Sequence, residues 1–238
     1  MRFMITRPAE DSAALSAQLA ALGHETVIEP LLSILPVEFD LPTEPVAALL
    51  LTSRHGARSL HWQGGYLHLA DVPMHCVGPA TARAARDAGF RRVSVADGSA
   101  ASLAADVAAG VDPAAGCVVH VRGRHARSGL ATHLRERGYD LREVVVYEAK
   151  PAQNLSPEGR SALANHLLDG VLLFSPRTAR IFVSLVREAA LAAAVTGLAA
   201  YCLSRAVAAP LATLRLSPRV ASAPDLDALL SLVSTAEP

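Results

Sequence analysis

The sequence predicts an α/β fold with two lobes, each a mostly parallel, doubly wound sheet, joined by a two-strand linker. Three observations support this prediction. Apolar runs of strand length alternate with amphipathic stretches of helix length along the 238 residues. The apolar runs lack strict alternation, which is typical of strands covered by helices on both faces of a parallel sheet. The first part of the chain also resembles its middle part, as expected of a duplicated unit.

The expected strands follow one another along the chain and are separated by helical patterns. In chain order these strands are Phe3–Thr6, Leu49–Thr52, Met74–Val77, Val93–Val95, Cys117–Val121, Val144–Tyr147, Val171–Phe174, Ala199–Cys202 and Arg219–Ala221. The first helical pattern lies at 12–22, where leucines recur at helical spacing behind a candidate N-cap, Asp11 or Ser12. This order of elements indicates a sheet wrapped by helices.

The internal repeat indicates two related lobes. A shift of 115 positions aligns the N-terminal segment with the middle of the chain without a gap. The pairs it matches are Arg7 with Arg122, Leu15 with Leu130, Leu19 with Leu134, Gly23 with Gly138, Pro36 with Pro151 and Pro42 with Pro157. Because proline ends helices and central strands, the stretches Pro36–Pro45 and Pro151–Pro157 are interpreted as linkers.

Composition narrows the class of protein. Hydrophobic residues make up 51% of the chain, which excludes a disordered chain. The formal net charge is zero, so we expect neither general nucleic-acid binding nor binding to an anionic membrane. No secretory signal follows Met1, and no apolar stretch approaches the roughly 20 residues that span a bilayer. We therefore expect a cytoplasmic protein without a membrane segment.

The cysteines and histidines give no sign of a metal site. Cys76, Cys117 and Cys202 are far apart in or beside apolar runs, and they are interpreted as core residues. No HExxH pair or other close set of metal ligands occurs among the histidines, and His61 and His68 are interpreted as surface residues. We expect no metal.

The common cofactor and nucleophile motifs are missing too. The chain has no GxGxxG after a strand, no P-loop and no GxSxG elbow. No pair of carboxylates is spaced for acid–base chemistry; Glu29 and Glu148 are interpreted as members of surface ion pairs. We expect no cofactor.

Hydroxyl groups and arginines recur directly after the expected strands. These turns are Thr6-Arg7-Pro8, Thr52-Ser53-Arg54, Gly78-Pro79-Ala80-Thr81, Arg122-Gly123-Arg124-His125 and Ser175-Pro176-Arg177-Thr178. In parallel α/β sheets ligands bind at this place, where helix N-termini offer free N–H groups. Each turn alone is explained by helix capping. Five of them predict a ligand cleft suited to a large polycarboxylate.

Taken in order, short motifs along nearly the whole chain resemble the uroporphyrinogen-III synthase family. They are Thr6-Arg7-Pro8, Pro30-Leu31-Leu32 with Ile34 and Pro36, Leu51-Thr52-Ser53 with Ala57-Arg58, Val77-Gly78 with Thr81-Ala82, Arg122-Gly123, Val146-Tyr147-Glu148 and Phe174-Ser175-Pro176. The chain departs from the family pattern where a second "G.(T)TA" turn is expected. There it reads Cys202-Leu203-Ser204-Arg205-Ala206, in which Ser204 supplies a hydroxyl shifted by one position.

The resemblance implies a discontinuous domain arrangement. One lobe would comprise residues 1–36 and 150–238, and the other residues 37–149. The linker strands would lie near 27–36 and 143–150. The duplicated proline segments fall where this crossing is expected.

The resemblance also implies the reaction and its residues. A linear tetrapyrrole, hydroxymethylbilane, would close to uroporphyrinogen III with inversion of its terminal pyrrole. Tyr147 could donate a hydrogen bond to the departing hydroxyl, or its ring could pack the linker strand with the hydroxyl bonded to backbone. The residues expected to bind the substrate are Arg7, Ser53, Arg54, Gly78, Thr81, Arg122, Gly123, Arg124, Ser175, Arg177 and Ser204. We expect a monomer, and the alternative function is a non-catalytic, two-lobed ligand-binding or sensor protein.

Overall fold

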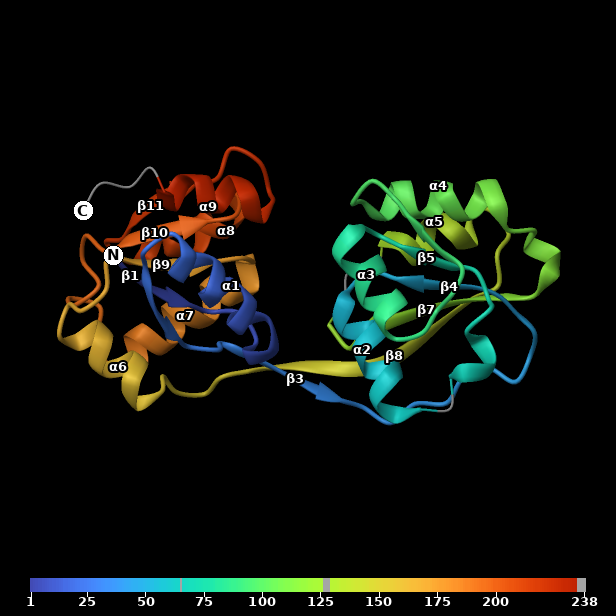
Figure 1. The fold of residues 1–238 in the computed structure, drawn as a ribbon, viewed down its shortest axis with the longest axis horizontal. Helices are drawn as coiled ribbons and strands as arrows, with labels where there is room; N and C mark the ends of the chain where they lie inside the picture. Colours follow the sequence, from blue (N-terminus) through green and yellow to red (C-terminus); the bar gives the residue numbers. More distant parts are fainter. Residues whose placement is uncertain (65, 126–128, 235–238) are drawn as a thin grey trace. The chain divides into compact units, whose positions relative to one another are not determined.

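The structure, a computed structural model, describes residues 1–64, 66–125 and 129–234 (Figure 1). The chain divides into two compact units: unit 1 comprises Met1–Ser33 and Lys150–Pro238, and unit 2 comprises Ile34–Ala149. Both boundaries fall within strands, β3 (Leu32–Pro36) and β8 (Leu141–Pro151). The chain therefore passes between the units twice, each time along a strand that ends at a proline.

Unit 1 is built on a five-stranded sheet with the order β11-β10-β9-β1-β2. Its strands are β1 (Arg2–Ile5), β2 (Glu25–Ile28), β9 (Gly170–Leu173), β10 (Ala199–Cys202) and β11 (Ser217–Val220). Every pair of neighbours in this sheet is parallel. The prediction of parallel sheets is thus confirmed for this unit.

Helices cover both faces of the unit 1 sheet. Along β1, Phe3 and Ile5 pack into the core beneath α1 (Ala9–Ala21) and α9 (Leu226–Ser234), whereas Met4 packs into the core on the other face. The helices on that other face are α6 (Pro157–Ala164), α7 (Pro176–Glu188) and α8 (Arg205–Ala208), followed by η3 (Ala209–Thr213). Burial on both faces explains why the strands read as continuous apolar runs.

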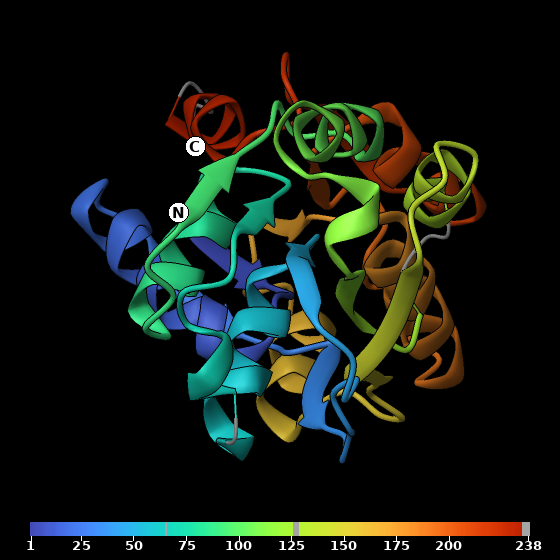
Figure 2. The same ribbon diagram turned by 90° about the vertical axis from the view of Figure 1, so that its right-hand side faces the viewer.

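Unit 2 contains a six-stranded sheet with the order β3-β8-β7-β4-β5-β6. Its further strands are β4 (Val46–Leu51), β5 (Met74–Cys76), β6 (Val93–Val95) and β7 (Cys117–Gly123), and the pairs from β8 to β6 are parallel. Helices again lie on both faces (Figure 2): α2 (Arg54–Gln63) and α3 (Pro79–Asp87) on one, α4 (Ala100–Gly110) and α5 (Gly129–Arg135) on the other. Two short turns of 3₁₀ helix are η1 (Leu67–Leu69) and η2 (Pro113–Ala115).

The strand orders of the two units show what the sequence repeat builds. Unit 1 reads β2-β1-β9-β10-β11, and unit 2 reads β8-β7-β4-β5-β6. The corresponding strands β1 and β7 begin at Arg2 and Cys117, which are 115 positions apart. Because the repeated segment comes first in unit 1 and last in unit 2, the two units have the same sheet in a circularly permuted chain order.

Two expectations about secondary structure differ from the structure. The stretch 27–36, expected as one linker strand, holds the end of β2 and all of β3, and β2 belongs to the unit 1 sheet. The expected N-cap, Asp11 or Ser12, is wrong, because Pro8 is the N-cap of α1. The N–H groups of Asp11 and Ser12 both bond to the Pro8 carbonyl, at 2.9 and 3.1 Å. Proline fits here because its fixed φ suits entry into the helix and it has no N–H to satisfy.

Glu29 is not the surface ion-pair residue that we expected. Its side chain is buried, at 2% exposure, and its two carboxylate oxygens accept from the N–H (3.0 Å) and Oγ–H (2.5 Å) of Ser156. Ser156 is the N-cap of α6, so Glu29 stabilises the positive end of that helix. Glu148 does form an ion pair, with its Oε2 3.5 Å from Nε of Arg124.

The three cysteines are free and buried, as predicted. Burial raises the pKa of Cys76 to about 12, partly opposed by Arg86, and that of Cys202 to about 11. Burial also raises the pKa of Cys117. Thiols of this kind stay protonated at neutral pH and are poor nucleophiles. Within the described part of the chain, no helix is both long enough and apolar enough to span a membrane.

Candidate functional site

The predicted site residues of unit 2 gather at one edge of its sheet. Strands β7, β4 and β5 are parallel neighbours, so the turns that follow them meet at their carboxyl ends. β8 is parallel to β7 and adds Tyr147 beside the end of β7. We call this set the unit 2 edge cluster: Ser53, Arg54, Gly78, Thr81, Arg122, Gly123, Arg124 and Tyr147.

Two helices begin within this cluster. Ser53 is the N-cap of α2, and its hydroxyl accepts from the N–H of His55 at 3.2 Å. Gly78 is the N-cap of α3, with an extended φ of −168° that any residue can adopt. A Cβ on Gly78 would meet nothing within 4 Å, so neither backbone conformation nor packing requires glycine there. The absence of a side chain leaves the N-terminus of α3 open to a ligand.

The side chain of Thr81 is less accessible to a ligand at this edge than its position in the sequence suggested. Its side chain lies on α3 and is buried, at 6% exposure. The reason is its place in the helix, because α3 turns its Thr81, Ala82 and Ala85 side toward the interior of unit 2. Ser53 and Gly78 are the more accessible members at these two helix starts.

The ring of Tyr147 lies on Gly123 and near the start of α2. Tyr147 and Gly123 are register partners on β8 and β7. A Cβ built on Gly123 would lie 2.5 Å from Cζ of Tyr147 and 2.9 Å from its hydroxyl oxygen. The centroid of the His55 ring is 5.8 Å from that of Tyr147. Tyr147 is half-buried, which holds the ring in place at the edge.

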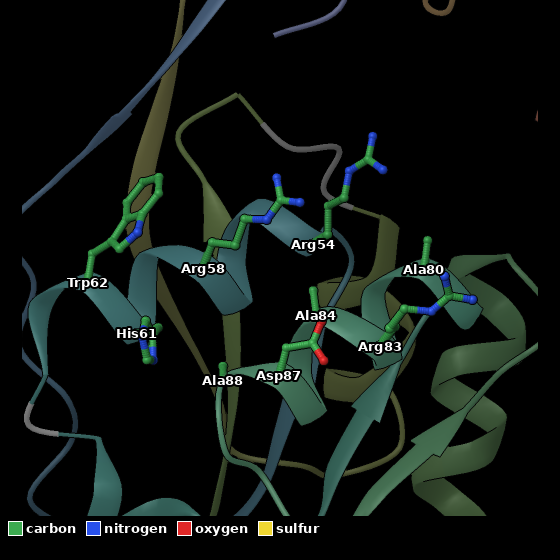
Figure 3. Close-up of a pocket in the computed structure, with 9 residues that line it drawn as sticks. All are labelled: Arg54, Arg58, His61, Trp62, Ala80, Arg83, Ala84, Asp87 and Ala88. Carbon is green, nitrogen blue, oxygen red and sulfur yellow. The ribbon is translucent and has the colours of Figure 1, made fainter. Parts of the chain in front are cut away.

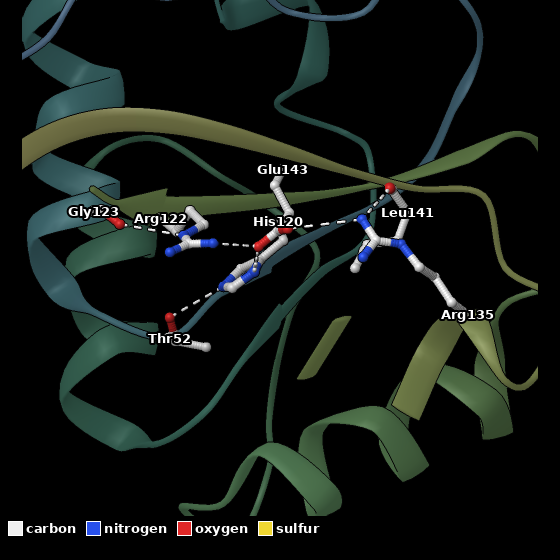
Figure 4. Close-up of polar contacts among 7 residues, drawn as sticks. All are labelled: Thr52, His120, Arg122, Gly123, Arg135, Leu141 and Glu143. Carbon is white, nitrogen blue, oxygen red and sulfur yellow. Dashed lines mark hydrogen bonds and ion pairs between the residues drawn. The ribbon is translucent and has the colours of Figure 1, made fainter. Parts of the chain in front are cut away.

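Arg122 lies at the same edge, but its charge is engaged (Figure 4). Its Nη1 is 2.5 Å from Oε1 of Glu143, and its Nε donates to the carbonyl of Gly123 at 3.2 Å. Nη2 of Arg135 lies 3.7 Å from the other oxygen of Glu143. Glu143 therefore offsets much of the positive charge that the sequence placed here. Arg122 serves better to fix the end of β7 than to bind a carboxylate.

His120 lies beneath this network and was not singled out from the sequence. Its Nε2 is 3.2 Å from Oγ1 of Thr52, and its Nδ1 is 3.8 Å from Glu143. The ring is 1% exposed, and burial lowers its pKa to about 4 despite the nearby Glu143 carboxylate. At neutral pH His120 is therefore uncharged, and its contact with Glu143 is not an ion pair. A histidine inside the apolar run Cys117–Val121 was the available signal.

A second edge cluster forms in unit 1 at the carboxyl ends of β1, β9 and β10, which are parallel neighbours. Its members are Arg7, Ser175, Arg177 and Ser204. Ser175 caps α7: its Oγ accepts from the N–H of Thr178 at 3.0 Å. Ser204 is the N-cap of α8 and makes no side-chain capping bond. It occupies the N-cap place that Gly78 has on α3, rather than the place of Thr81.

Arg7 of the unit 1 edge cluster is held from two sides. Its guanidinium carbon lies 4.7 Å from the centroid of the Phe174 ring. Its Nη2 is 3.9 Å from Oδ2 of the buried Asp11. A cation stacked on an aromatic face keeps a fixed direction.

The fold defines a class of protein: a pair of related parallel α/β units, each with helix N-termini, hydroxyls and arginines at the carboxyl edge of its own sheet. Among the described residues, no group of three or more His, Cys, Asp or Glu side chains is placed to hold a metal ion. A profile of the family described as uroporphyrinogen-III synthase HemD matches residues 13–231. The chain belongs to the uroporphyrinogen-III synthase family, whose members are enzymes of tetrapyrrole synthesis.

Solved structures of low sequence identity share the fold. The uroporphyrinogen-III synthetase from Helicobacter pylori 26695 aligns with a TM-score of 0.68 and 21% identity, covering 98% of both chains. A mutant uroporphyrinogen III synthase from the extremely thermophilic bacterium Thermus thermophilus gives a TM-score of 0.55 and 20% identity over 98% of this chain and 96% of that chain. The comparison with curated protein sequences gives no match.

Proposed function

We propose that this protein is a cyclising hydro-lyase that converts hydroxymethylbilane to uroporphyrinogen III and water. The observation that carries the proposal is the unit 2 edge cluster, where Tyr147 stands beside the N-terminus of α2 in a chain of this family. A tyrosine hydroxyl, free helix N-termini and arginines are the groups that a polycarboxylate with a departing hydroxyl requires.

The reaction needs no external oxidant or reductant. The hydroxyl of the bilane leaves with a proton as water, and the remaining azafulvene is attacked by the substituted carbon of the terminal pyrrole. The spiro intermediate breaks its bond from that carbon to the neighbouring methylene bridge. The methylene then bonds to the free α-carbon of the inverted ring, which loses a proton. The product and one water account for all atoms of the substrate.

The protein contributes mainly geometry. Holding reacting groups in one arrangement can contribute about 7–11 kcal/mol toward lowering a barrier. The bilane also cyclises without an enzyme to the uninverted isomer, so the enzyme has to favour one folded conformation of the chain. We assign this to the helix N-termini at the unit 2 edge cluster. Tyr147 donates a hydrogen bond to the departing hydroxyl.

Several arginines bind the carboxylates of the substrate, and each contributes part of the binding free energy. Arg7 and Arg177 lie at the edge of the unit 1 sheet, and Arg54 and Arg124 at that of the unit 2 sheet. Arg122 pairs with Glu143, and Arg124 with Glu148. Exposed arginine–carboxylate contacts contribute only about 0–1 kcal/mol each and are screened by salt. Removal of one arginine should therefore raise KM several-fold and leave turnover intact.

We further propose that the protein works as a monomer in the cytoplasm. The substrate is a polyanion that does not cross a lipid bilayer unaided, which supports a site of action where the bilane is made. Light scattering coupled to size-exclusion chromatography tests the monomer, and a dimer mass would contradict it.

The experiment for the proposed function is an isomer analysis. Purified protein, with no metal or organic cofactor added, is given hydroxymethylbilane, and the products are oxidised and separated by chromatography. We expect the type III isomer in excess over the type I isomer formed without protein. Formation of type I alone, or activity abolished by a chelator, would contradict the proposal.

A further inference from the structure

A hollow of about 280 Å³ lies in unit 2 between α2 and α3 (Figure 3). Arg54, Arg58, His61 and Trp62 line it from α2, and Arg83 and Asp87 line it from α3, together with alanines of α3. On each helix these residues recur at three-, four- and eight-residue spacings, so each helix turns one continuous face to the hollow. We call this feature the α2–α3 groove.

The groove combines an apolar surface with positive charge. Trp62 is 52% exposed, although tryptophan is a side chain that proteins usually bury or place at a binding surface. The alanines of α3 add a second apolar patch and leave room above their short side chains. A flat ring can lie against such a surface.

The charges around that surface are mostly of one sign. Arg54 and Arg58 stand four residues apart on α2, a spacing at which like charges destabilise a helix. Arg83 adds a third cation from α3, and Asp87 is the one acid among the residues that line the groove. A carboxylate bound in the groove would lie beside these three cations. The ligand favoured by these groups is a flat ring that carries carboxylates.

We propose that the α2–α3 groove is a subsite for one pyrrole ring of the tetrapyrrole and its carboxylate side chains. The inference rests on the proposed function, because it assigns the ligand from the substrate class. The volume agrees with a single ring, since pockets that hold whole drug-sized ligands run from about 300 to 1,000 Å³. Arg54 belongs both to the groove and to the unit 2 edge cluster, so one ring in the groove leaves its neighbours near that edge.

Trp62 makes the proposal testable, because it is the only tryptophan in the chain. The full-length protein is titrated with a monopyrrole bearing one acetate and one propionate, and Trp62 emission is followed. A monopyrrole does not absorb where tryptophan emits, so a change reports contact rather than energy transfer. We expect a saturable change with the diacid and none with its dimethyl ester.

Matched variants separate the groove from general charge. Arg83→Gln should weaken the apparent Kd of the diacid several-fold, whereas Arg86→Gln, on the same helix but outside the groove, should leave it unchanged. With hydroxymethylbilane as substrate, Trp62→Leu should raise KM several-fold and leave kcat unchanged. This is the pattern for a group that binds ground state and transition state equally.

The possible outcomes are distinct. No change with the diacid, an equal change with the ester, or an Arg83→Gln titration like that of wild type would each overturn the subsite. An unchanged KM in Trp62→Leu would also overturn it, even if the monopyrrole binds. Failure of the wild-type protein to form the type III isomer would instead contradict the proposed function, and the fluorescence titration would still report on the groove.

Discussion

The ring of Tyr147 lies directly against the backbone of Gly123, its register partner across strands β8 and β7. Gly123 has no left-handed φ, so backbone conformation does not require glycine there. What requires it is space, because a Cβ would come within 2.5 Å of Cζ in the tyrosine ring. The glycine therefore sets the position of the ring, and with it the position of the hydroxyl.

Gly123→Ala should displace the Tyr147 ring while the unit 2 sheet stays folded. We expect kcat to fall by about tenfold or more, the loss that follows when one hydrogen bond made in the transition state is misplaced. Gly110→Ala is the control, since Gly110 ends α4 on the surface and a Cβ there meets nothing within 4 Å. Steady-state kinetics on both variants test the idea, which is contradicted if both retain wild-type kcat.

Tyr147→Phe removes the hydroxyl and keeps the ring on Gly123. If the hydroxyl acts on the leaving group, the loss should appear mainly in kcat, by around tenfold or more, with little change in KM. Thermal unfolding of the variant shows whether packing is preserved. An unchanged kcat would mean that Tyr147 only packs the strand and that catalysis rests on positioning alone.

We propose that the two compact units are independent domains. Within each unit, the two chain segments that lead to the other unit lie side by side. In unit 1 the N–H of Ala152 donates to the carbonyl of Leu31, and in unit 2 the N–H of Val37 donates to the carbonyl of Val146. Each unit also has a core on both faces of its own sheet. Residues 34–149 expressed alone should therefore unfold cooperatively and give a dispersed NMR spectrum. A stable fragment boundary near residue 115 in limited proteolysis would contradict this division.

Much of the fold could be predicted because its strands are buried on both faces and read as apolar runs. β2 was not recognised as a separate strand because it is a short edge strand, Glu25–Ile28, with Glu25 and Ile28 exposed. The N-cap of α1 was predicted at Asp11 or Ser12 because these residue types are preferred caps. The helix begins after Pro8 instead, since proline also suits the start of a helix.

The candidate site was predictable as a set of turns but not as a set of contacts. The serines, arginines and glycines that follow apolar runs in the sequence lie in the two edge clusters of the structure. The neutralisation of Arg122 depends on Glu143, which is brought close only by the pairing of β7 with β8. The burial of Thr81 depends on the direction in which α3 packs. Neither can be read from spacing along the chain.

Glu29 and Ser156 join segments 127 positions apart, and their contact should contribute to the stability of unit 1. Glu29→Gln keeps the shape of the side chain but removes the charge from two hydrogen bonds at the start of α6. We expect a loss of about 1.5–3 kcal/mol in the free energy of unfolding, the range for hydrogen bonds to charged groups. Urea denaturation gives this value directly.

The control for this prediction is Glu158→Gln, on the same first turn of α6 but with a side chain 67% exposed. It should change stability by no more than about 0.5 kcal/mol. A double-mutant cycle with Ser156→Ala isolates the pair, and additive losses would show that Glu29 and Ser156 act separately.

We expect the free energy of unfolding to depend on pH because the ring of His120 is buried. Burial lowers the pKa of its ring from 6.5 to about 4, so the folded protein holds the neutral form. Between these two values the unfolded chain binds a proton that the folded chain does not, and stability therefore rises with pH across this window. The contribution is fully present above pH 6.5 and is lost as the pH falls toward 4. Its size is at most about 3 kcal/mol, from 1.36 kcal/mol per pKa unit.

His120→Gln should flatten this dependence, because glutamine keeps a polar side chain in the strand but cannot take up a proton. Denaturation in urea at a series of pH values from about 7.5 down to 4.5 gives the slope for each protein. Subtracting the two curves removes the contribution of the other histidines. Thr52→Val is the matched control: it deletes the partner at 3.2 Å from Nε2 but keeps the ring buried, so the wild-type slope should persist. Parallel curves for wild type and His120→Gln would show that folding does not change the pKa of His120.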